Sequence, residues 1–137
     1  LPLYAIKNIK EELRVSRTLK IRTFFKSLIE ECGCKAYYER ANKNVLYPYA
    51  VFLFESTDIT DVSKREIEIT IDIWDKTDDS SNIEVLTDTI IHAINHKFIL
   101  PEDIPSLRIY GVRKRSLLDE DSTLKRRQIE CSIIYFD

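Results

Sequence analysis

Glycine, proline and cysteine are scarce in this chain, which holds two, four and three of them among 137 residues. So few glycines and prolines predict long helices and strands rather than a loop-rich scaffold. The odd number of cysteines, Cys32, Cys34 and Cys131, argues against a framework of disulfides. The spacing of Cys32 and Cys34 also differs from that of a zinc site, which usually takes four ligands. We therefore expect reduced thiols and no bound metal.

The chain also lacks an apolar run of about 18 residues, so no membrane span is predicted, and its start shows no signal-peptide pattern. Its net charge of −2 gives no overall attraction to nucleic acid or acidic membranes. A hydrophobic content of 44% and a charged content of 32% are typical of a soluble globular protein. The length suits one domain, residues 1–137, with residues 1–32 as an N-terminal helical segment.

The most informative segment is an alternating strand at residues 65–74. Successive side chains of a strand point to opposite faces of the sheet, so one face carries only isoleucines, Ile67, Ile69, Ile71 and Ile73. The other face carries mostly polar residues: Glu66, Glu68, Thr70, Asp72 and Trp74. This pattern predicts a sheet with one dry face and one wet or partner-facing face.

Hydrophobic spacing predicts two helical regions. In residues 5–32 an apolar stripe recurs at three- and four-residue steps, comprising Ile21, Phe24, Phe25, Leu28, Ile29 and Cys32. Ser16 is a candidate N-cap within this region, and Gly33 stands where a left-handed C-terminal cap belongs. The second helix follows the segment from Ser81 to Glu84, which matches a capping box.

Four further strands are expected, at residues 34–39, 49–54, 107–114 and 126–136. Residues 49–54 are apolar on both faces, which predicts a central strand covered on both sides. Gly111 within a strand indicates a bulge or a close approach. Short connections favour an antiparallel sheet. The predicted fold class is α+β, a mainly antiparallel sheet of four to five strands with two or three helices packed on it.

Patterns typical of enzymes have little support. His92 and His96 stand one helical turn apart, but alanine follows the first histidine where a zinc-protease helix has glutamate. Glu66, Glu68 and Asp72 evoke a metal-dependent nuclease, yet no lysine follows the last acid, so an exposed acidic sheet face is favoured. There is neither a G-x-S-x-G elbow nor a glycine-rich phosphate loop. We expect no enzymatic activity, no catalytic residues and no cofactor.

Two basic clusters, residues 113–115 and 125–127, flank a predicted hairpin that would bring six cations together. Bound DNA is one explanation, and solubilising charges around a loop are another. Acidic turns oppose them, at Asp58, Asp61, Asp75, Asp78, Asp79 and residues 119–121. Basic and acidic rims on one small domain suit head-to-tail contacts between identical subunits. Leu117 and Leu118 in the hairpin either form a docking point or fold back onto the sheet.

Several segments resemble phage tail terminator, or tail-completion, proteins. The resemblance covers about residues 47–137 and is carried by Tyr47-Pro-Tyr49 before an apolar strand, and by Ile71-Asp-Ile-Trp-Asp75 with its polar turn. Residues 86–95 resemble the helix that follows, and residues 125–136 resemble the last strand. Residues 1–46 match only in being helical.

The resemblance implies a structural subunit that assembles, typically as a hexameric ring, on the head-proximal end of a tail tube. There it ends tube polymerisation and mediates joining to the head or neck. Its expected partners are itself, the tail tube protein, and sheath and head–tail connector proteins, with no membrane and with DNA contacted at most through the ring lumen. The expected location is a virion tail or tail-like particle, assembled in the bacterial host cytoplasm. Contractile tail, flexible tail and bacteriocin particle all stay open.

The residues that we expect at the interface with a subunit or the tube combine the basic clusters, the paired leucines and the acidic turn. They are Arg113, Lys114, Arg115, Leu117, Leu118, Lys125, Arg126, Arg127, Asp75, Asp78, Asp79 and Trp74. The alternative function is a nucleic-acid-binding protein that uses the basic hairpin at residues 113–127, whose affinity would fall steeply with salt.

Overall fold

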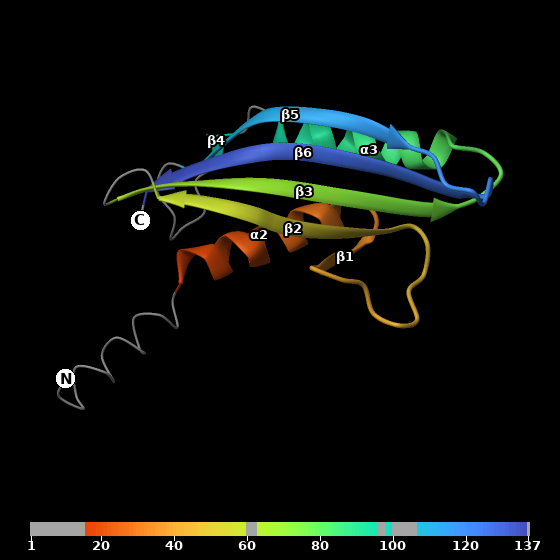
Figure 1. The fold of residues 1–137 in the computed structure, drawn as a ribbon, viewed down its shortest axis with the longest axis horizontal. Coiled ribbons are helices and arrows are strands. Elements are labelled where there is room, and N and C mark those ends of the chain that lie inside the picture. Colours follow the sequence, from red (N-terminus) through yellow and green to blue (C-terminus); the bar gives the residue numbers. More distant parts are fainter. Residues whose placement is uncertain (1–15, 60–62, 96–97, 100–106, 137) are drawn as a thin grey trace.

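The computed structural model describes residues 16–59, 63–95, 98–99 and 107–136 (Figure 1). In chain order the elements are α2 (Arg17–Glu31), β1 (Lys35–Tyr38), β2 (Tyr49–Ile59), β3 (Lys64–Lys76), α3 (Ser81–Ile94), β4 (Phe98–Ile99), β5 (Leu107–Leu117) and β6 (Leu124–Phe136). The helix expected over residues 5–32 is thus seen from Arg17, and its expected part before residue 16 lies outside the described residues.

The strands form one sheet in the order β1-β2-β3-β6-β5-β4. Every neighbouring pair is antiparallel except β1 and β2, which run parallel. The predicted α+β class is therefore confirmed. The two-residue strand β4 comes in addition to the five strands expected from the sequence.

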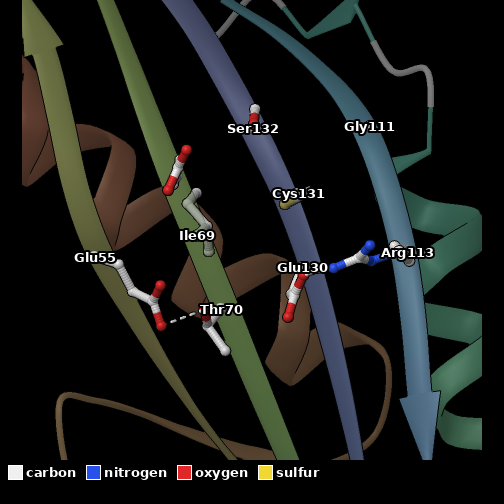
Figure 2. A pocket seen from close by; sticks show the side chains of 9 residues that line it. Glu55, Ile69, Thr70, Gly111, Arg113, Glu130, Cys131 and Ser132 are labelled. Carbon is white, nitrogen blue, oxygen red and sulfur yellow. Dashed lines mark hydrogen bonds and ion pairs between the residues drawn. The ribbon is translucent and has the colours of Figure 1, made fainter.

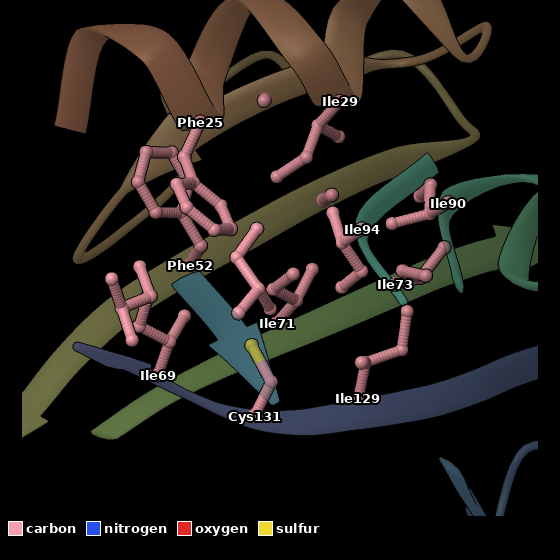
Figure 3. Close-up of a cluster of buried hydrophobic side chains, with 14 of the residues drawn as sticks. Phe25, Ile29, Phe52, Ile69, Ile71, Ile73, Ile90, Ile94, Ile129 and Cys131 are labelled. Carbon is pink, nitrogen blue, oxygen red and sulfur yellow. The ribbon is translucent and has the colours of Figure 1, made fainter. Parts of the chain in front are cut away.

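Both helices lie on one face of the sheet, and the hydrophobic core fills the space between them and the strands (Figure 3). Phe25 of α2 meets Phe52 of β2, with ring centres 6.5 Å apart. Ile90 and Ile94 of α3 complete the core over the inner strands and are fully buried, as is Ile71 of β3. The isoleucine face of residues 67–73 is thus the dry face that the sequence predicted.

The start and end of α2 lie where the sequence placed them. Ser16 is the N-cap residue, although its side chain makes no capping hydrogen bond. After Cys32 the chain leaves the helix at Gly33, whose φ of +120° suits a residue without Cβ. The amide of Gly33 donates to the carbonyl of Glu30 at 3.2 Å, which ties down the last turn.

Helix α3 begins differently from the predicted capping box. Its N-cap is Ser80, one residue early, and Ser81 lies in the first turn, where its amide and hydroxyl both donate to Asp79. These bonds lower the pKa of the Asp79 carboxyl below its usual value. The Glu84 side chain does not reach back to the N-cap, because the cations of two strands bind it instead.

The prediction that residues 49–54 are covered on both faces is wrong. Ala50 and Phe52 are buried under α2, but Leu53 on the other side of β2 is 38% exposed. Among the described residues both helices pack on the same face, so nothing covers the second one. Gly111 confirms the expected bulge: the register of β5 against β6 shifts there, and its φ is +65°.

Candidate interaction surface

The face of the sheet opposite α2 and α3, which we call the open face, holds part of the predicted interface: Arg113, Arg115, Leu117, Arg126 and Trp74. Strand register aligns its side chains in rows that cross β5, β6, β3 and β2 in turn. The three rows nearest the β5–β6 hairpin are Leu117-Arg126-Trp74-Tyr49, Arg115-Gln128-Asp72-Val51 and Arg113-Glu130-Thr70-Leu53. The surface therefore runs from basic on β5 to apolar and aromatic on β2.

The two arginines of β5 on this face share one carboxylate. Glu130 of β6 accepts from Arg113 at 2.6 Å, and Figure 2 shows these two side chains. It also accepts from Arg115 at 3.3 Å. The hydrogen bond from Arg113 is the main cause of the lowered pKa of Glu130, and the bond from Arg115 lowers it further. Both guanidiniums remain accessible, since the side chains of Arg113 and Arg115 are 69% and 53% exposed. Two cations thus face one anion, which leaves this part of β5 with excess positive charge.

Beside this pair the open face is hollowed into a shallow depression of about 330 Å³ (Figure 2). Glu55, Glu68 and Glu130 contribute carboxylates to its lining, and Thr70 donates to Glu55 at 2.7 Å. No group of three or more potential metal ligands gathers among the residues that the structure describes. The depression is a polar hollow lined by carboxylates, one of which is hydrogen-bonded to Thr70.

Trp74 and Arg126 form the centre of the row nearest the hairpin. The Arg126 guanidinium lies over the Trp74 ring and binds Asp72 at 3.1 Å. Gln128 also donates to Asp72, at 3.0 Å. On its other side Trp74 stacks against Tyr49, with ring centres 5.3 Å apart and planes at 18°. The tryptophan that the sequence singled out is therefore part of an ordered aromatic cluster on the open face.

The six cations of the hairpin do not form one patch, which corrects the sequence-based expectation. Side chains alternate along each strand, so Arg113, Arg115 and Arg126 lie on the open face and Lys114 and Arg127 lie on the helix side. The Lys125 ammonium donates to the Ser122 carbonyl within the turn. The cluster seen in the sequence is thus divided between two faces and the loop.

On the helix side the cations meet acids of α3. Glu84 pairs with Arg127 and, at 3.2 Å, with Lys114, which also binds Asp88 at 2.9 Å. The hydrogen bond from Arg127 is the main cause of the lowered pKa of Glu84. The pKa of Lys114 is raised, mainly by its hydrogen bond to Asp88 and next by its hydrogen bond to Glu84. These pairs fasten the helix to the hairpin strands.

The acidic turn and the paired leucines are also divided. Asp75 is buried, at 5% exposure, and accepts from the amide of Lys76, so it belongs to the strand end rather than to a rim. Asp78 and Asp79 are exposed. Leu117 lies half-buried in β5, whereas Leu118 is 99% exposed. One leucine folds back onto the sheet and the other is open to a partner.

Three partnerships escaped the sequence analysis: Glu130 with two arginines, Glu84 with the hairpin, and Arg126 with Trp74. Each joins strands or helices far apart in the chain, so only the strand register could have shown it. Of the two histidines, His92 is exposed, and His96 lies outside the described residues. No described helix has the length and apolarity needed to span a bilayer.

Comparison with known proteins gives a fold and no family. No protein-family profile matches the chain, and no curated protein matches it in sequence. Among solved structures, the chain is similar to a chain of the virion of a native gene transfer agent particle, with a TM-score of 0.53 and 11% identity. The alignment covers 94% of this chain and 92% of that chain, so the likeness extends over the whole fold.

Proposed function

We propose that this chain is a structural virion assembly protein that caps the head-proximal end of a tail tube as a ring. In this role it ends tube polymerisation and provides the surface to which a head or neck joins. The observation that carries the proposal is the fold, shared over nearly the whole length with a chain of a virion particle. The finer assignment, a tail terminator, rests on the sequence resemblance of residues 47–137.

The open face supports a function by contact. It combines an aromatic cluster around Trp74 with the exposed cations of Arg113 and Arg115. Leu118, which is 99% exposed, follows directly after β5. Apolar groups ringed by charge are typical of surfaces that bind other proteins. A terminator needs two such surfaces, one that fits the growing end of the tube and one that tube subunits cannot recognise.

The proposal includes no catalytic step, and the state of the thiols supports this. Burial raises the pKa of Cys34 and of Cys131 to about 12. Nucleophilic cysteines need the opposite, a pKa lowered by cations or a helix N-terminus. Both thiols therefore serve as small apolar groups of the core.

The pairing of the hairpin cations argues against nucleic-acid binding as the main role. Lys114 and Arg127 already bind the carboxylates of α3, and Arg113 and Arg115 share Glu130. The cations would face a phosphate backbone from two opposite sides of the sheet, and Lys114 and Arg127 would first have to leave the carboxylates of α3. Binding to DNA at low salt, with an affinity that falls steeply as salt rises, would restore that alternative.

The test is removal of the chain from a host that produces the particle. We expect electron micrographs to show tails of uncontrolled length without attached heads, and expression of the wild-type chain to restore normal particles. Tails of normal length joined to heads in the absence of the chain would contradict the proposal.

A further inference from the structure

Two edges of the sheet are left without a strand partner over much of their length, within the part of the chain that the structure describes. Strand β1 pairs with β2 only from Tyr49 to Phe52, and the remainder of β2 extends to Ile59. At the opposite edge, β4 pairs only with Leu107 and Arg108 of the eleven residues of β5. Unpaired amides and carbonyls along such edges are a template for adding a further strand.

The two edges carry opposite charge. On β2 the exposed segment includes Glu55 and Asp58, and Asp58 and Ser56 pair across to Glu66 and Glu68 of β3, which add two more acids. The corresponding part of β5 is basic from Arg113 to Arg115, and only Glu130 offsets the two arginines on the open face. Each edge therefore repels the same edge of another copy and attracts the opposite edge of another copy.

The strand directions are also compatible. Strand β5 is antiparallel to β6, β6 to β3, and β3 to β2, so β5 runs antiparallel to β2 (Figure 1). A second copy placed beside the sheet with its strands in the same orientation therefore presents its β5 antiparallel to this β2. Antiparallel addition restores the alternating backbone hydrogen bonds of a ladder without turning the subunit over.

We propose that the β5 edge of one copy pairs with the β2 edge of the next, which joins the sheets of neighbouring subunits head to tail. The residues at the contact are Arg113 and Arg115 on one side and Glu55 and Asp58 on the other. This inference rests on the proposed function, because it states how the ring of that proposal is held together. Two different edges in contact make a heterologous interface, the kind that closes into rings.

Like charge on each edge has a second consequence. Charged edge residues are a common means by which proteins prevent edge-to-edge pairing. Here the protection is selective. Two β5 edges in contact would place cations against cations, and two β2 edges in contact would place acids against acids. Symmetric dimers are thereby disfavoured. The head-to-tail contact between unlike edges remains the favourable one.

The test uses two variants that are each unable to pair with themselves. In the first, Glu55→Lys with Asp58→Lys makes both edges basic. In the second, Arg113→Glu with Arg115→Glu makes both edges acidic, and Glu130→Gln removes the carboxylate that the new glutamates would repel. Each variant is introduced alone, and both together, into the host that lacks the chain. Circular dichroism of the purified variants verifies that they are folded.

We expect neither variant alone to restore normal tail length, and both together to restore it, because their unlike edges can alternate around the ring. A control with Lys26→Glu and Lys43→Glu reverses exposed cations on α2 and on the loop before β2 and should behave as wild type. Restoration by either edge variant alone would overturn the inference, and so would failure of the two folded variants together. In both cases the proposed function would stand, since it fails only if loss of the chain leaves the tails unchanged.

Discussion

The guanidinium carbon of Arg126 lies 5.0 Å from the centre of the Trp74 ring on the open face. The same side chain binds Asp72, while its Nε is buried without a hydrogen bond to any described residue. Arg126 is thus held between an aromatic ring and a carboxylate of its own molecule. Reversing its charge would disturb the sheet itself, so the edge cations are better probes of assembly.

Trp74 is the only tryptophan, so its fluorescence reports on this arrangement. Replacing Arg126 by alanine should shift the emission to longer wavelength and increase quenching by acrylamide, because the ring loses the side chain that covers it. The variant should lose about 1 kcal/mol of unfolding free energy, the size of a partly exposed cation–π contact. Arg126→Lys keeps the charge without the planar group and should fall between the two. An unchanged emission spectrum in the alanine variant would contradict the stacking.

Glu84 should make stability depend on pH. Its pKa is lowered in the folded protein below the ordinary 4.5, mainly by the hydrogen bond from Arg127. A lowered folded pKa contributes stability that is complete above the unfolded value and is lost as pH falls through the folded value. Glu84→Gln should therefore cost about 1 kcal/mol at pH 7, and this cost should shrink as pH falls below 4.5 through the lowered folded pKa.

Urea unfolding at a series of pH values measures this difference. Asp88→Asn is the matched control. Asp88 forms an ion pair with Lys114, and Lys114 still pairs with Glu84 when the charge of Asp88 is removed. It should cost less than Glu84→Gln at pH 7. A loss that stays the same from pH 7 down through the acid range would show that the ion pair is not the cause.

Gly111 should tolerate substitution poorly although there is space around it. A Cβ added there meets no atom within 4 Å, so the cost comes from the backbone, whose φ is +65°. Gly111→Ala should lower the unfolding free energy by about 1–2 kcal/mol, and Gly111→Asn by less, since asparagine adopts positive φ more readily. Thermal denaturation followed by circular dichroism measures both. An alanine variant as stable as wild type would contradict the bulge geometry.

Ile71 is fully buried between β3 and the helices, and its truncation should be costly. Ile71→Ala should lose about 2–5 kcal/mol of unfolding free energy through lost burial and the cavity left behind. Ile59 is 69% exposed on β2, so Ile59→Ala is a matched control with an expected change of about 0.5 kcal/mol or less. Chemical denaturation of both variants separates a buried position from an exposed one on the same sheet.

The dry face of the sheet could be predicted because it depends on local alternation. Four isoleucines at every second position can be buried together only on one side of a strand. The helix stripe of α2 and the positive φ of Gly33 and Gly111 follow equally from local pattern and backbone sterics. Whether residues 49–54 are covered on both faces could not be predicted in this way, because it depends on the face of the sheet on which the two helices pack.

The sequence by itself determined the α+β class, the strand that divides the molecule into a dry and a wet face, and the positions of its turns. These features depend on side-chain periodicity and backbone conformation, which act over a few residues. Only the tertiary structure decided which charges meet, since the register between β3, β6 and β5 joins residues far apart in the chain, such as Asp72 and Gln128, which are 56 positions apart. It thereby divided the six cations of the hairpin and left an acidic and a basic edge on opposite sides of one sheet.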